Sequence, residues 1–203
     1  GGSAAGAGRW WPDWRSGLTW RLGLVQGGGS ALYFGISAFL PGYLHAAGRP
    51  QLVGPCLTAL NLVQLPTSAA MAVLSRRRLR PSPVLAGAAV IAVVGLAGVV
   101  ELHGAGAIAG AAVVGLAGSA ALVVSLALPP LLAGPEDVHR LSAGMFTLGY
   151  GLAFLLPLLG GVLWDGLGEP RAAFLPALAG IVLFGALGGR RWVGLRDQLP
   201  ATG

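Results

Sequence analysis

Six apolar runs, each about as long as a membrane-spanning helix, follow one another along this chain and are separated by short breaks. A helix needs roughly 20 mostly apolar residues to cross a hydrocarbon core of about 30 Å. We therefore expect six transmembrane helices, at about residues 18–44, 51–74, 84–102, 105–132, 141–163 and 171–189. The predicted fold class is an all-α integral membrane protein built as a six-transmembrane-helix bundle.

The charged residues are too few to cover a water-exposed surface. They make up 10% of the chain, while apolar residues make up 55%, and soluble domains carry about 25% charged residues. The thirteen basic residues, all arginine, give a pI near 11. They lie in short clusters between the apolar runs instead of along one face, so we expect a lipid bilayer and not a nucleic acid as the partner.

The arginines also orient the predicted helices, because basic residues are enriched in cytoplasmic loops. With six spans, eleven arginines fall on one side and only Arg49 and Arg171 on the other. We therefore expect a multi-pass protein of the cytoplasmic membrane with both termini and the loop at residues 75–81 in the cytoplasm. The predicted segments are a linker and interfacial segment at 1–17, the transmembrane bundle at 18–192 and a cytoplasmic tail at 193–203.

Small residues four positions apart predict the faces on which the helices meet, because close backbone approach drives helix association in lipid. Such spacing occurs on the first, fourth and sixth predicted helices and indicates a tight bundle. The residues concerned are Gly23, Gly27, Ala31 and Gly35, then Gly106 and Gly110, and finally Gly185 and Gly189.

Polar side chains recur at helical spacing on the first, second and fifth predicted helices. An unpaired polar group costs several kcal/mol in hydrocarbon, so these residues should face a neighbouring helix or a water-filled cavity. For a single residue, hydrogen bonding between helices and contact with a substrate are equally good interpretations. For the stripes together we favour a lined pathway, with Gln26, Tyr33, Asn61, Gln64 and Tyr150 as candidate substrate-binding residues.

Titratable residues are scarce in the predicted spans. Glu101 and His103, at the external end of the third helix, are candidates for proton coupling, the alternative being solvated groups at a helix end. Glu136, Asp137 and His139 share a short loop and are expected to be solvated charges instead of metal ligands. The sequence has no nucleophile elbow, phosphate-binding loop or zinc spacing. We therefore expect no enzyme, no catalytic residues, no cofactor and no metal.

Three stretches carry a family pattern: residues 22–41, which end in Phe39-Leu40-Pro41, residues 74–78, and residues 135–165. They resemble, in order, the seventh helix, the basic cytoplasmic motif, and the tenth–eleventh loop with the eleventh helix of a major facilitator superfamily transporter. Within that superfamily the chain is most similar to the cyanate permease-like (CynX/NimT) group. Ser75 stands where the basic motif often has an Asp.

The resemblance implies the carboxy-terminal half of a secondary active transporter, which works by alternating access between two six-helix halves. The implied substrate is a small anion or a small polar organic molecule, often coupled to protons. The implied partner is an amino-terminal six-helix half or a second copy. A start without Met, on a Gly/Ala-rich stretch, leads us to expect part of a longer protein.

Two other functional classes stay open. A non-transporting membrane scaffold or assembly subunit predicts a dry bundle in which every stripe residue is bonded to a neighbour. An intramembrane enzyme predicts converging titratable residues, of which the sequence supplies almost none.

Overall fold

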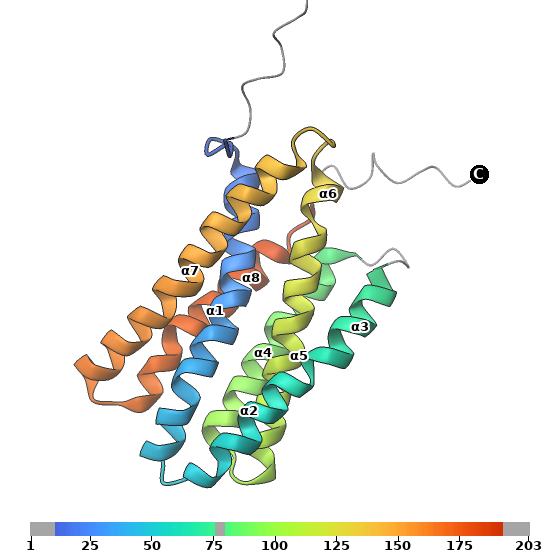
Figure 1. Ribbon diagram of the computed structural model, residues 1–203. Coiled ribbons are helices and arrows are strands. Elements are labelled where there is room, and N and C mark those ends of the chain that lie inside the picture. The colour runs from blue at the N-terminus through green and yellow to red at the C-terminus, as the bar shows by residue number, and fades with distance from the viewer. Residues whose placement is uncertain (1–10, 76–79, 193–203) are drawn as a thin grey trace, which may run out of the picture.

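The computed structural model describes residues 11–75 and 80–192, and the secondary structure of this part is helical throughout (Figure 1). Long helices run up and down the bundle and are joined by short connections. In chain order the elements are α1 (Gly17–Ala46), η1 (Pro50–Leu52), α2 (Val53–Leu62), α3 (Gln64–Ser75), α4 (Pro81–Glu101), α5 (Ala105–Ala127), α6 (Pro129–Leu132), α7 (Val138–Leu167), η2 (Pro170–Phe174) and α8 (Leu175–Gly188).

Four helical stretches of the described residues are long and apolar enough to cross a membrane. They are α4, α5, α7 and the combined stretch Pro170–Gly188, with mean hydropathies between 1.7 and 2.4. The predicted all-α class is thus confirmed, and the four stretches indicate a membrane-embedded protein. The 30-residue α1 is long enough to span, but its glycine, serine and glutamine residues lower its hydropathy. The second predicted run is divided into α2 and α3, each too short to cross alone.

The break between α2 and α3 falls at Val63 and follows from Pro66. Proline has no N–H to donate to the carbonyl four residues earlier, and its ring crowds that carbonyl, which here belongs to Leu62. Side chains bond the neighbouring carbonyls: Gln64 Nε2 donates to Leu60 O at 3.1 Å and Thr67 Oγ1 donates to Val63 O at 2.7 Å. The break therefore lies halfway along the predicted second span.

Glycines form the contact surfaces between helices. A Cβ atom added at Gly27 of α1 would lie 2.6 Å from Leu152 of α7, and one at Gly185 of α8 would lie 2.5 Å from Ala89 of α4. A Cβ atom at Gly110 of α5 would lie 2.6 Å from the backbone of α4. These close approaches confirm the contact faces predicted for these three glycines.

The beginning of α1 and the end of α8 are joined at one end of the bundle. The Arg21 guanidinium donates to three backbone carbonyls, those of Leu187 at 3.0 Å, Arg190 at 2.7 Å and Arg191 at 3.2 Å. Its carbon atom lies 3.7 Å from the centre of the Trp192 ring. This arrangement supplies donors to carbonyls that the end of α8 leaves unpaired.

Candidate functional site

Two of the predicted site residues meet halfway along the bundle, between α1 and α2. The Tyr33 hydroxyl donates to Asn61 Oδ1 at 2.9 Å, and Asn61 Nδ2 donates to Leu57 O of its own helix at 2.8 Å. Asn61 is exposed and Tyr33 is half-buried. The pair therefore forms a polar bridge at the surface of the bundle, and α2 holds Asn61 in place for it.

Tyr150 lies near the middle of α7 and is 57% exposed. Its ring stacks on Phe146, with centroids 5.8 Å apart and planes 13° apart, while Phe154 one turn further is 69% exposed. The Tyr150 hydroxyl makes no hydrogen bond to any residue that the structure describes. Among the four apolar stretches α7 is also the least covered, with only 17% of its most apolar window buried.

Gln26 of α1, in contrast, is 2% exposed, and its side chain faces α5. Its Oε1 accepts from the Ser125 hydroxyl of α5, and its Nε2 donates to Ser30 Oγ at 3.3 Å. Gly149 of α7 makes room for the side chain, because a Cβ atom there would lie 2.7 Å from Gln26 Cγ. In this conformation Gln26 forms a hydrogen bond between helices, the first of the two interpretations that its sequence position allowed.

Ser125 was not among the predicted site residues. Ser119 and Ser125 are the polar side chains of an otherwise apolar α5, and that isolation is the sequence signal that could have identified them. Gln64 is half-buried and its amide donates to Leu60 O at the α2–α3 break, so that hydrogen bond is made within its own stretch of chain and not to another predicted residue.

Glu101 and His103 lie at the end of the bundle where α4 meets α5, and both are exposed. Glu101 Oε1 is 3.2 Å from Arg171 Nη1, an ion pair in which both side chains are more than half exposed. Such pairs contribute about 0 to 1 kcal/mol. The two residues line the same cavity of about 360 Å³ but make no hydrogen bond to each other within the described part.

At the opposite end, a second cavity of about 310 Å³ lies between the start of α1 and the start of α7. The Arg140 guanidinium contacts Asp137 Oδ1 at 2.8 Å and donates to Trp11 O at 2.9 Å. Asp137 is therefore part of an ion pair. Within residues 11–75 and 80–192, no three His, Cys, Asp or Glu residues are grouped so that they could hold a metal ion.

The described part of the chain is all-helical, its four long apolar helices indicate a membrane-embedded protein, and polar groups are exposed halfway along the bundle. No protein-family model matches the chain, and no curated protein or solved structure shows significant similarity to it.

The link between α5 and Gln26 can be tested by removing one hydroxyl. We expect Ser125→Ala to lower the free energy of unfolding by about 1 kcal/mol, because it leaves the buried Gln26 oxygen without its donor. Ser119→Ala is the matched control, since among the described residues Ser119 Oγ bonds only Leu116 O of its own helix, at 3.1 Å. Reversible unfolding in mixed detergent micelles measures both variants, and equal losses would contradict the proposed link.

Proposed function

We propose that this chain is part of a secondary active transporter that moves a small polar solute across the cytoplasmic membrane. The observation that carries the proposal is Tyr150, whose hydroxyl is exposed and unpaired among the described residues, halfway along an apolar helix. An unpaired hydroxyl costs about 2 kcal/mol or more in hydrocarbon. A water-lined pathway or a second protein surface removes that cost.

A pathway needs a second wall, and α7 offers the surface against which it would form. The helix is mostly uncovered, and Tyr150 and Phe154 stand on its exposed side. We infer that an amino-terminal six-helix half, or a second copy of this chain, covers it, as in the major facilitator superfamily. Transporters of this kind bind their substrate near the midplane, between their two repeats.

In this proposal Tyr33, Asn61 and Tyr150 hydrogen-bond the substrate. Among the described residues Asn61 bonds Tyr33 and Leu57, which leaves one amide hydrogen that can donate to a solute. Gln26 holds α1 on α5 in this conformation, and Gln64 stabilises the break beside the pathway. Six spans with both termini in the cytoplasm are part of the same proposal, supported by the distribution of arginines.

Uptake into vesicles that contain the full-length protein tests the proposal, using a panel of radiolabelled small anions and small polar solutes. For a transported solute, we expect Asn61→Leu and Tyr150→Phe each to reduce uptake about tenfold, the effect of losing one hydrogen bond to the substrate. Phe154→Leu is the matched control, because it changes an exposed side chain of α7 that has no polar group. The proposal fails if no solute of the panel is taken up or if Asn61→Leu and Tyr150→Phe transport like the unmodified protein.

A membrane scaffold or assembly subunit is the second candidate function. The observation in its favour is Gln26, which is buried and bonded to Ser30 and Ser125 as a dry bundle requires. In that case Tyr150 meets a partner subunit. Tyr150→Phe would then weaken co-purification of the partner, and vesicles would take up no solute of the panel.

A further inference from the structure

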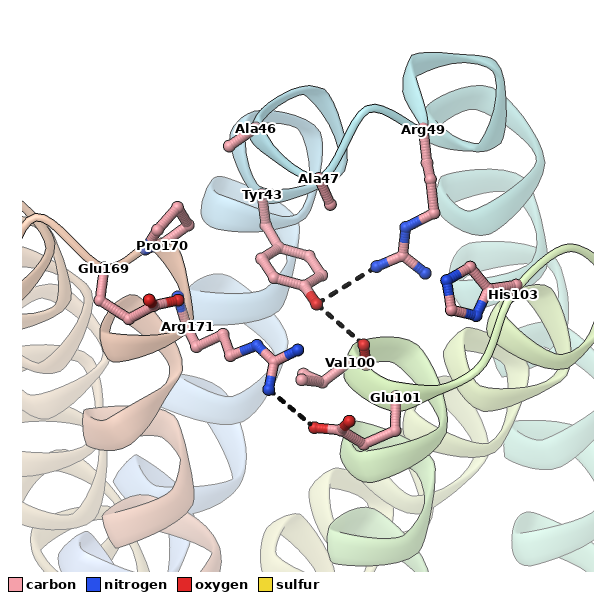
Figure 2. Close-up of a pocket in the computed structure, with 10 residues that line it drawn as sticks. All are labelled: Tyr43, Ala46, Ala47, Arg49, Val100, Glu101, His103, Glu169, Pro170 and Arg171. Atoms are coloured by element: carbon pink, nitrogen blue, oxygen red, sulfur yellow. Dashed lines mark hydrogen bonds and ion pairs between the residues drawn. The ribbon is translucent and has the colours of Figure 1, made fainter.

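The cavity of about 360 Å³ lies at the end of the bundle opposite the start of α1 and the end of α8. Figure 2 shows it between the last turn of α1, the end of α4 and the connection that follows α7. Ligand pockets in proteins occupy about 300 to 1,000 Å³, so this volume suits a small solute. The midspan residues Tyr33, Asn61 and Tyr150 are not part of its lining.

Arg49 is the unusual member of the lining, since its side chain is charged and only 8% exposed. Its Nη1 donates to Leu102 O at 2.6 Å, and its Nη2 donates to the Tyr43 hydroxyl at 3.2 Å. Tyr43 in turn donates to Val100 O at 2.9 Å (Figure 2). Both partners of the guanidinium are therefore neutral groups.

No carboxylate of the described residues lies within 4.0 Å of the Arg49 guanidinium. The two ion pairs in the described part of the chain are Arg140–Asp137 and Arg171–Glu101, and neither includes Arg49. The carbonyl end of α4 offers about half a negative charge, which leaves the rest of the guanidinium charge uncompensated. A buried cation without a counter-ion is costly. An anion that enters the cavity would remove that cost.

The guanidinium also has donors to spare. Arginine carries five N–H donors in a rigid planar fork, and within the described part of the chain two of them are used, by Leu102 and Tyr43. The fork matches the two oxygens of a carboxylate, to which it can donate two parallel hydrogen bonds. Because the cavity borders Arg49, the remaining donors can reach a bound solute.

The other charges of the lining restrict the solute. Glu101 is paired with Arg171, and Glu169 accepts from the Arg171 backbone N–H at 3.4 Å. Figure 2 shows Glu169 on the opposite side of the cavity from Arg49. These two carboxylates repel a solute that carries several negative charges. A solute that binds Arg49 through a single carboxylate carries only one negative charge and is repelled less.

We propose that this cavity binds a small solute through one carboxylate, which the buried Arg49 guanidinium holds. The site is distinct from the midspan pathway and does not depend on transport. The carboxylate can belong to a monocarboxylate or to an amino acid, whose ammonium group would then face Glu169.

Titration calorimetry on the full-length protein in detergent tests the proposal with propionate, alanine and propionamide. We expect propionate or alanine to bind and propionamide not to bind, because propionamide has the same shape as propionate without the charge. Tighter binding of alanine identifies an amino acid site, and tighter or equal binding of propionate identifies a monocarboxylate site. This comparison needs no variant, so it holds even if a substitution at Arg49 impairs folding.

Two variants then locate the site. Arg49→Lys keeps the charge but loses the fork, and we expect it to weaken binding of the carboxylate about tenfold or more. Arg171→Lys is the matched control, because it makes the same substitution at an exposed arginine of the same cavity and keeps a positive charge beside Glu101, and we expect a change below about threefold. Propionamide that binds as tightly as propionate, or Arg49→Lys that binds like the unmodified protein, would overturn the proposal.

Discussion

Gly115→Ala is expected to lower the free energy of unfolding by about 3 kcal/mol, at the upper end of the usual cost of overpacking. Gly115 lies where α5 crosses α2. An added Cβ atom would meet the Leu60 carbonyl oxygen, and it would come within 2.9 Å of the Leu60 carbonyl carbon and 2.8 Å of Val63 Cγ1. Backbone atoms cannot move aside by a change of rotamer, so the two helices must separate.

Gly118→Ala is the matched control, three residues further along the same helix. A Cβ atom at Gly118 would have no other atom of the described residues within 4 Å, so we expect unchanged stability or a gain of up to about 1 kcal/mol from helix propensity. Reversible unfolding in mixed detergent micelles, followed by circular dichroism, measures both variants. Equal stability of the two variants would show that α2 and α5 do not approach so closely.

Arg21→Ala is the second large expected effect, with a loss of about 3 kcal/mol in the free energy of unfolding. Hydrogen bonds from a charged donor contribute about 1.5 to 3 kcal/mol each, and the three made by Arg21 share one guanidinium, so they do not add fully. The substitution removes donors from three carbonyls at the end of α8 and the ring contact with Trp192. It also removes a favourable positive charge from the carbonyl end of that helix.

Arg15→Ala is the control for the loss of one positive charge near the start of α1. Arg15 is exposed and its backbone N–H, not its side chain, bonds Asp13, so we expect a change within about 0.5 kcal/mol. Arg21→Lys should fall between the two, because an ammonium group cannot donate to all three carbonyls from one plane. Comparable losses for Arg15→Ala and Arg21→Ala in the same unfolding experiment would contradict the role given to Arg21.

The helical class of the protein and several of its contact faces could be predicted from the sequence. Run length indicates a spanning helix, because the hydrocarbon thickness sets the number of residues required. Four of the six predicted runs correspond to helical stretches of the described residues that are long and apolar enough to cross a membrane. The spacing of small residues located Gly27, Gly110 and Gly185 on contact faces, since residues four apart share one side of a helix. The nearest neighbour of Gly106 is Leu102, in the turn just before α5, because Gly106 belongs to the first turn of that helix.

The candidate site was predictable only in its polar character. Helical spacing predicts that Tyr33, Asn61 and Tyr150 avoid lipid, and the structure joins the first two and exposes the third. The same spacing gave no means to distinguish Gln26 from these three residues. Gln26 is buried against Ser125, which lies 99 residues away in the sequence. The rotation of each helix about its own axis separates these cases, and that rotation depends on the packing of several helices at once.

Sequence by itself determined that this protein is helical and apolar, because both properties follow from neighbouring residues and from the thickness of a bilayer. Tertiary structure decided which polar groups are satisfied. Arg49 counted in the sequence only as one of two arginines on the external side of the predicted bundle, yet folding buries it against Tyr43 and the end of α4. Partners more than 50 residues apart along the chain meet only when the register of two helices is set, and the local pattern of residues carries no information on that register.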